Sequence, residues 1–203
     1  SYILHAFTGL LSTDKNANIV GGLAEKWEFS DDGLTWTFHL RPDLKWSDGT
    51  DLTAEDFVYS WKRLADPALA DPYSYSYDLL NVVEGYEEAS NGDLDALQVS
   101  APDKDTFVVK LSTPCTFFDQ IAAFTSTVPV QKKTVEENGD AWATKPESYV
   151  SSGPYRMTEY VDGDKIVYEK NPYYYDKDNV TFDTLVWHLI EDGNSVYTAY
   201  NQG

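Results

Sequence analysis

The sequence predicts a fold that mixes helices with antiparallel strands, of the α+β or mixed α/β class. Apolar residues recur at every second position over 34–40, which indicates a half-buried strand, and segments 97–111 and 155–170 are typical of hairpins. Between these segments lie stretches with helical periodicity, of which 54–65 is the clearest. At 203 residues the chain can bury a full core, as one large domain or two small ones.

Turn sequences frame the first strand and helix. "SDDG" precedes the strand and "SDG" follows it, and both are typical of turns because Gly tolerates positive φ and Asp bonds its own backbone. The apolar positions of the strand are Leu34, Trp36, Phe38 and Leu40. Thr53 and Asp56 resemble a capping box, and Pro67 ends the helix that follows. The apolar face of this helix comprises Phe57, Trp61, Leu64 and Ala65.

Alternation and turn residues place the remaining elements. They are expected in this order: a short helix over 82–89, a hairpin over 97–111 with its turn at 102–104, a buried helix around 117–124, an amphipathic helix that Gly139 ends, a hairpin that turns at 162–164, a strand over 182–190 and a helix from 194 or 195. The buried helix carries Phe117, Phe118, Ile121 and Phe124.

Charge and composition exclude several classes of protein. The formal net charge is -19 and Lys and Arg do not cluster, so we expect no nucleic-acid partner. The acidity is typical of a solvated surface, with attraction of cationic ligands as the alternative. A single cysteine, Cys115, excludes an internal disulfide and is expected to be buried among apolar residues. The apolar start and the helical pattern at the end suggest a piece of a longer protein.

No catalytic constellation stands out. His5, His39 and His188 lie far apart in sequence, and no nucleophile elbow, phosphate loop or calcium loop is present. We therefore expect no metal, no cofactor and no enzyme. One enzymatic alternative stays open, because many carboxylates beside many aromatic residues could form an acidic glycoside hydrolase.

Five segments resemble the extracellular solute-binding proteins that serve ABC importers of peptides, the oligopeptide- and dipeptide-binding family. These segments are "GLAEKWEFSDDGLTWTFHLR", "LKWSDGTDLTAEDFVYSWKRLADP", "DKDTFVVKLSTP", "SSGPYRMTEY" and "EKNPYYYD". They follow the family's order and spacing over nearly the whole chain, and the first two are closest to oligopeptide binders.

The resemblance implies a two-lobed clamp that closes on its ligand, of which this chain holds a part. Residues 8–131 would form a small accessory domain with Trp36, Trp46 and Trp61 in its core. Residues 1–7 and 132–203 would belong to the first lobe, of the periplasmic-binding-protein type, and the second lobe would be absent. The turn at 152–155 would be structural.

The resemblance also implies a function and a site. The chain would belong to a monomeric protein that lies outside the cytoplasmic membrane, free in a periplasm or lipid-anchored, and delivers oligopeptides to an ABC permease. Tyr73 would face the bound peptide, with Tyr75 and Ser76 as further contacts; packing within a loop is the alternative for Tyr73. The same scaffold also serves oligosaccharides and nickel chelates, so these ligands stay open.

Overall fold

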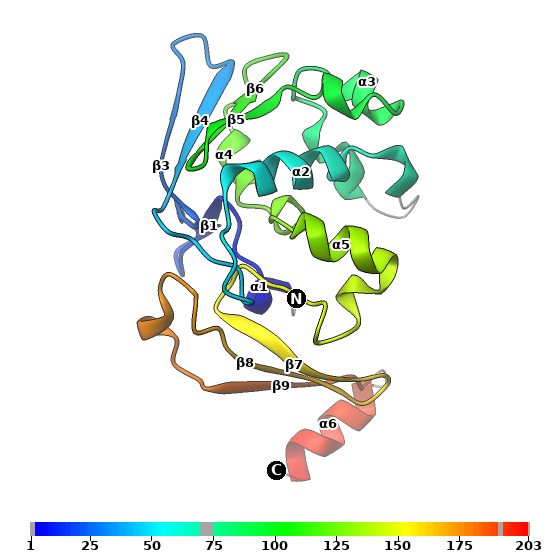
Figure 1. Ribbon diagram of the computed structural model, residues 1–203. Helices are drawn as coiled ribbons and strands as arrows, with labels where there is room; N and C mark the ends of the chain where they lie inside the picture. The colour runs from blue at the N-terminus through cyan, green and yellow to red at the C-terminus, as the bar shows by residue number, and fades with distance from the viewer. Residues whose placement is uncertain (1–2, 70–74, 191–192, 203) are drawn as a thin grey trace.

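The computed structural model describes residues 3–69, 75–190 and 193–202 of the chain. Two antiparallel sheets lie at different levels of the molecule, a four-stranded sheet above and a three-stranded sheet below (Figure 1). Helices accompany both sheets, which confirms the mixed α and β class predicted from the sequence.

The upper sheet contains the strand with the clearest alternation. Its strands follow the order β3 (Ala24–Phe29), β4 (Thr35–Leu40), β6 (Thr106–Lys110) and β5 (Val99–Asp103). Trp36, Phe38 and Leu40 on β4 are buried, as predicted. The ring of Trp36 packs on that of Phe118, with 5.2 Å between centroids. Because each aromatic ring buries about 150–250 Å², this cluster supplies much of the upper core.

Helix α2 (Ala54–Leu64) begins at the predicted capping box and covers this sheet. The backbone N–H of Thr53 donates to Oδ2 of Asp56 at 2.8 Å. Phe57 and Trp61 are fully buried, and the indole N–H of Trp61 donates to the carbonyl of Thr127 at 3.1 Å. Trp36 and Trp46 are also buried, at 5% and 1% exposure, so all three tryptophans pack in the core as predicted.

Three local predictions need correction. Helix α3 (Tyr86–Ser90) starts later than predicted, because Gly85 adopts φ 79° and Val83 pairs with Leu111 in a β-bridge. The turn between β5 and β6 lies at residues 104–105 and not at 102–104, since Asp103 still belongs to β5. Helix α4 (Phe118–Ala122) buries Phe118 and Ile121, but Phe117 is 52% exposed and Phe124 half-buried.

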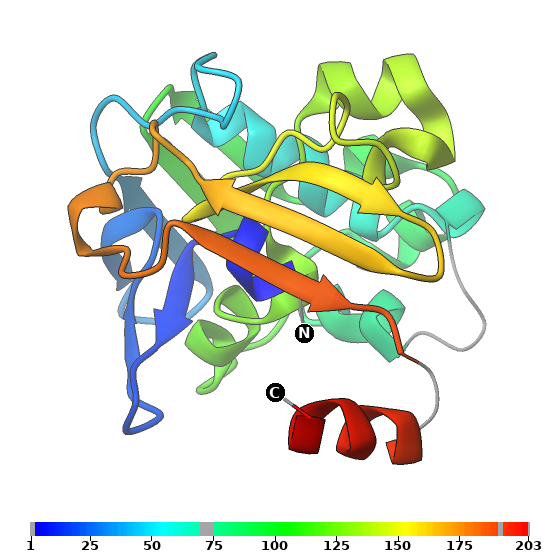
Figure 2. The same cartoon turned by 90° about the horizontal axis from the view of Figure 1, so that it is seen from below.

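The lower sheet follows the order β7 (Tyr155–Val161), β8 (Lys165–Lys170) and β9 (Thr184–His188). Helix α5 (Lys132–Asn138) ends at Gly139 as predicted, and α6 (Gly193–Gln202) lies beyond β9 (Figure 2). The outer edge of β9 pairs with no strand in the described part of the chain. Beside this edge Phe182 is 65% exposed and Val186 is 50% exposed.

Short elements connect these layers. They are α1 (Ile3–Ala6), β1 (Leu11–Thr13), β2 (Ile19–Gly21), η1 (Pro67–Leu69), η2 (Tyr75–Leu80), η3 (Leu94–Ala96), η4 (Thr125–Thr127), η5 (Gly139–Ala143) and η6 (Lys177–Asn179). Strands β1 and β2 form an antiparallel hairpin of their own.

Buried polar contacts join the segment after β4 to the turn before β7. The backbone N–H of Ser47 donates to the carbonyl of Ser151 at 2.9 Å, and the N–H of Ser151 donates to Oγ of Ser47 at 2.9 Å. The loop after β8 adds a second contact, because the guanidinium of Arg41 lies 4.4 Å from the ring centroid of Tyr175. Cys115 is buried, as predicted. The Ser47–Ser151 and Arg41–Tyr175 contacts therefore connect the upper layer to the lower layer.

Candidate functional site

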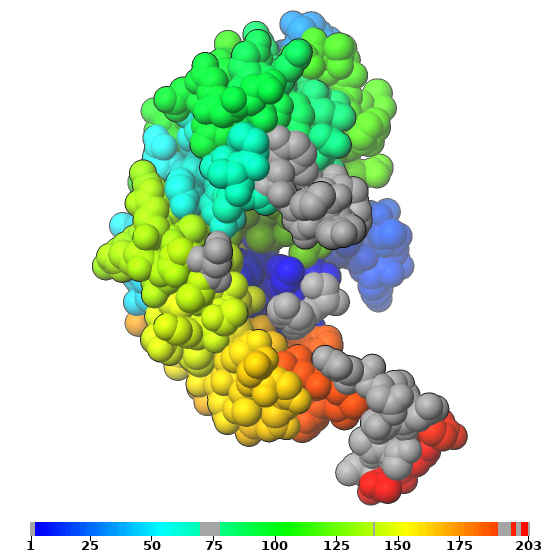
Figure 3. Space-filling model, turned by 90° about the vertical axis from the view of Figure 1, so that its right-hand side faces the viewer, coloured from blue at the N-terminus to red at the C-terminus, as the bar shows by residue number. Residues whose placement is uncertain are grey.

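One face of the molecule is hollowed between the two layers (Figure 3). Helix α1 lies at the base of the hollow, and the β1–β2 hairpin projects at its side. A groove of about 420 Å³ lies where α1, the hairpin and the α4–η4 segment meet. We call it the neutral groove; the described residues that line it are Leu4, Thr13, Ala17, Ile19, Gln120, Ala123, Phe124 and Thr125.

The hairpin that forms one wall of the neutral groove is fixed by its own turn. Oδ1 of Asp14 accepts the backbone N–H groups of Asn16 and Asn18 at 2.8 and 2.9 Å, and these hydrogen bonds, with a further one from the Asn18 side chain, lower the pKa of Asp14. Ala17 adopts φ 64°, a left-handed conformation that only a well-anchored turn imposes on alanine. Thr13 pairs with Ile19 in register, so both residues are held at the groove.

Helix α1 is held against the turn at 152–155. The N–H of Gly153 donates to the carbonyl of Ala6 at 2.7 Å, and Oγ of Ser152 accepts the N–H of Thr8 at 3.1 Å. His5 packs against the rings of Tyr155 and Trp187, and burial lowers its pKa. These contacts are structural, and they fix Leu4 at the groove.

The neutral groove combines apolar surface with uncharged polar groups. Leu4 is 56% exposed, while Ile19 is half-buried. Gln120 adds an amide with donors and an acceptor, and Thr13 and Thr125 add hydroxyls. Among the residues that the structure describes, all eight that line the groove are uncharged. A site of this kind binds by shape, apolar contact and a few hydrogen bonds.

The structure describes the backbone of two of the three residues that were predicted to contact the ligand. Tyr73 lies outside the described residues. Tyr75 and Ser76 are the first two residues of η2, a 3₁₀ helix that ends at the buried Leu80. The residues of the neutral groove were not predicted, because Leu4 and Gln120 come from distant parts of the sequence. The local sequence around each of them carries no signal that would have marked it as a site residue.

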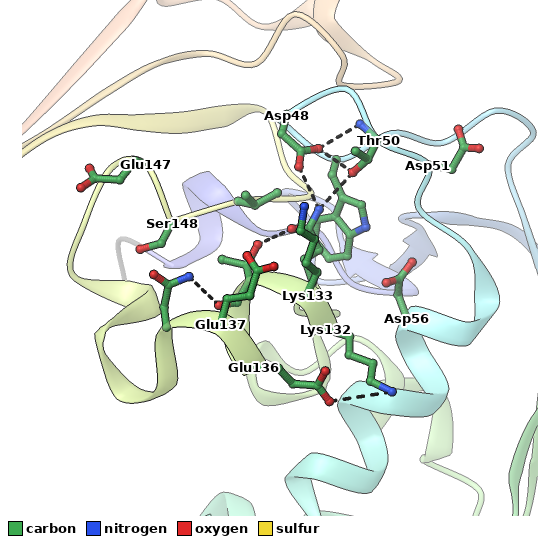
Figure 4. Close-up of a pocket in the computed structure, with 15 residues that line it drawn as sticks. Asp48, Thr50, Asp51, Asp56, Lys132, Lys133, Glu136, Glu137, Glu147 and Ser148 are labelled. Carbon is green, nitrogen blue, oxygen red and sulfur yellow. Dashed lines mark hydrogen bonds and ion pairs between the residues drawn. The ribbon is translucent and has the colours of Figure 1, made fainter.

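A second groove, of about 670 Å³, lies between the 46–56 segment and helix α5 (Figure 4). We call it the acidic groove, since its lining includes the carboxylates Asp48, Asp51, Asp56, Glu136, Glu137 and Glu147 and the two lysines Lys132 and Lys133. A pair of catalytic acids, as a glycoside hydrolase requires, would have to be found among such residues.

The two partly buried carboxylates of the acidic groove have structural roles. Burial acts to raise the pKa of Asp48, but hydrogen bonds from Thr50 and Gln131 outweigh it and hold the pKa below its usual value. Burial raises the pKa of Asp56, whose carboxylate caps α2 through Thr53. Both carboxylates therefore accept hydrogen bonds that hold neighbouring segments in place. Asp48 and Asp56 do not form a free pair of catalytic acids.

The residues that the structure describes contain neither a candidate metal site nor a candidate membrane span. Within them, no group of three or more His, Cys, Asp or Glu side chains could hold a metal ion. Nε2 of His39 lies 3.4 Å from Oε1 of Glu28, and His188 is exposed at the end of β9. No helix in the described ranges is long and apolar enough to cross a membrane.

The chain belongs to the bacterial extracellular solute-binding proteins, family 5, whose pattern it matches over residues 18–203. The mixed α/β fold and the hollow face agree with this class.

Two individual relatives are similar to this chain over nearly its whole length. The chain is 40% identical to the periplasmic oligopeptide-binding protein OppA of Salmonella typhimurium, over 97% of this chain and 36% of that protein. It is 33% identical to the "Probable deoxycholate-binding periplasmic protein YgiS" of Escherichia coli, over 99% of this chain and 38% of that protein.

The fold of this chain is closely similar to that of a solved structure of a relative. The crystal structure of Haemophilus influenzae OppA in complex with RPPGFSPFR matches with a TM-score of 0.92 at 35% identity, covering 100% of this chain and 39% of that one. The chain thus spans well under half the length of the relatives it matches.

Proposed function

We propose that this chain is part of the substrate-binding component of an ABC importer, which captures oligopeptides outside the cytoplasmic membrane and delivers them to a permease. Membership of the solute-binding family is the observation that carries the proposal. The oligopeptide-binding relatives and the hollow face with its neutral groove support peptides as the ligand. The protein would bind its ligand and release it unchanged.

We further propose that residues 8–131 form an accessory domain, and that residues 1–7 and 132–203 form part of the first ligand-binding lobe. The whole upper sheet falls within 8–131 and the whole lower sheet within 132–203, which supports this division. A second lobe, supplied by the rest of the protein, would close over the hollow face. The clamp would act as a monomer.

Tyr73, Tyr75 and Ser76 are proposed as ligand contacts on the share of the cleft wall that this chain supplies. A tyrosine suits this role because its ring covers side chains of any kind while its hydroxyl bonds the peptide backbone. In the full-length protein, Tyr73→Ala should weaken peptide binding without lowering the melting temperature of the unliganded protein. Lost stability with unchanged affinity would make Tyr73 a packing residue.

The proposed location is the periplasm or the outer surface of the cytoplasmic membrane, with a lipid anchor in the second case. Periplasmic relatives support a location outside the cytoplasm. Fractionation of cells, with and without detergent, distinguishes a free from an anchored protein.

The first test is a thermal-shift screen of the full-length protein against mixed peptides, oligosaccharides, nickel and deoxycholate. The last is included because one relative carries a deoxycholate-binding name. A ligand that binds only the native state raises its melting temperature by mass action. We expect a shift with peptides. A shift with another ligand alone would overturn the substrate but keep the importer, and release of reducing sugar would make the protein a hydrolase.

A further inference from the structure

We propose that the neutral groove is a side-chain subsite that selects an uncharged, apolar residue of the bound peptide. This inference rests on the proposed function, since it assigns part of the peptide's specificity to Leu4, Ile19, Gln120 and Phe124.

The charge of the groove is the first argument. The chain as a whole carries 34 acidic and 15 basic residues, yet the eight described residues that line the neutral groove are all uncharged. A lysine or glutamate side chain that entered it would lose hydration without gaining a partner of opposite charge. An aliphatic or aromatic side chain would instead cover the exposed faces of Leu4 and Phe124.

The size and position of the groove are the second argument. A volume of about 420 Å³ lies at the small end of the range for ligand pockets. The groove therefore suits one large side chain with its adjoining backbone better than a whole oligopeptide. Two of its walls, α1 and the β1–β2 hairpin, lie at the base and at the side of the hollow (Figure 3), so a peptide held against the hollow would reach it.

The rigidity of the wall is the third argument. The Asp14 hydrogen bonds hold the hairpin turn, and Ala17 keeps a left-handed backbone at the groove. Residues in such conformations cluster at ligand-binding sites, where the surrounding structure imposes them. A wall that is already ordered binds a side chain without the entropic cost of ordering a loop.

The test uses the full-length protein and alanine-based peptides in which one position at a time is Leu, Lys or Glu. Isothermal calorimetry should show, at one position, at least about tenfold tighter binding of Leu than of Lys or Glu. Gln120→Glu changes charge without changing size. It should weaken binding of the Glu peptide and strengthen binding of the Lys peptide, each by about fivefold, as one exposed ion pair allows.

Gln98→Glu is the matched control, because Gln98 is also exposed but lies away from the neutral groove. It should leave all affinities unchanged. Leu4→Ser should weaken binding of the Leu peptide by about fivefold, while Val20→Ser, on the exposed residue next to Ile19, should not. Equal binding of all three peptides, with no effect of Gln120→Glu, would overturn this inference alone. A protein that binds no peptide would overturn the proposed function as well.

Discussion

Substitution of Gly153 tests whether the turn before β7 fixes helix α1. A methyl group at Gly153 would lie 2.7 Å from the carbonyl carbon and oxygen of Ala6 and 2.9 Å from the backbone nitrogen of Phe7. These atoms belong to the backbone, so they cannot rotate away. Overpacking of this kind costs about 1–3 kcal/mol, and the 2.7 Å hydrogen bond from Gly153 to Ala6 would weaken as well.

Gly153→Ala should therefore lower the free energy of unfolding by about 3 kcal/mol, or the melting temperature by roughly 6–12 °C. Circular dichroism of the 203-residue chain measures this change. Gly9→Ala is the control, because its methyl group would lie 3.5 Å from its nearest neighbour, the carbonyl oxygen of Leu11. This substitution should leave stability unchanged or slightly raised. Equal stability of Gly153→Ala and the unmodified chain would refute the reasoning.

Three further outcomes are expected. Ser47→Ala leaves the buried N–H of Ser151 unpaired and should cost about 1–3 kcal/mol in urea unfolding; a loss no larger than that of the exposed Ser12→Ala would contradict this. Burial raises the pKa of Asp56. The stability that protonated Asp56 contributes is therefore fully present below the ordinary Asp pKa, and it is lost as pH rises through the raised folded value. Asp56→Asn should therefore be at least as stable as the unmodified chain at pH 7, and a clear loss of stability there would count against the raised pKa. Finally, the isolated chain should fold but bind peptide weakly, and calorimetry that gives a micromolar Kd would show that one side of the clamp suffices.

The elements that the sequence predicted well are those with strong local signals. Alternation identified β4, and the Thr53–Asp56 capping box identified the start of α2. Helix α3 was misplaced because its apolar pattern continues upstream into Val83, which instead pairs with Leu111. Such pairing between distant segments leaves no trace in local periodicity.

The candidate site was harder to predict than the fold. The resemblance to peptide binders drew attention to Tyr73, Tyr75 and Ser76. The neutral groove, by contrast, forms where Leu4, Ile19 and Gln120 meet, and each has an ordinary local environment in the sequence. Only the tertiary arrangement brings them together. The acidic residues that favoured a hydrolase are explained locally, because Asp48 and Asp56 bond neighbouring backbone.

Strand β9 has a practical consequence for work with this chain. Its outer edge presents backbone donors and acceptors that no described strand uses, next to the exposed Phe182 and Val186. An open edge with apolar neighbours is a template onto which a second molecule can add its own strand. Preparations of the isolated chain should therefore self-associate as concentration rises, and a lysine in place of Val186 would be the first substitution to keep them monodisperse.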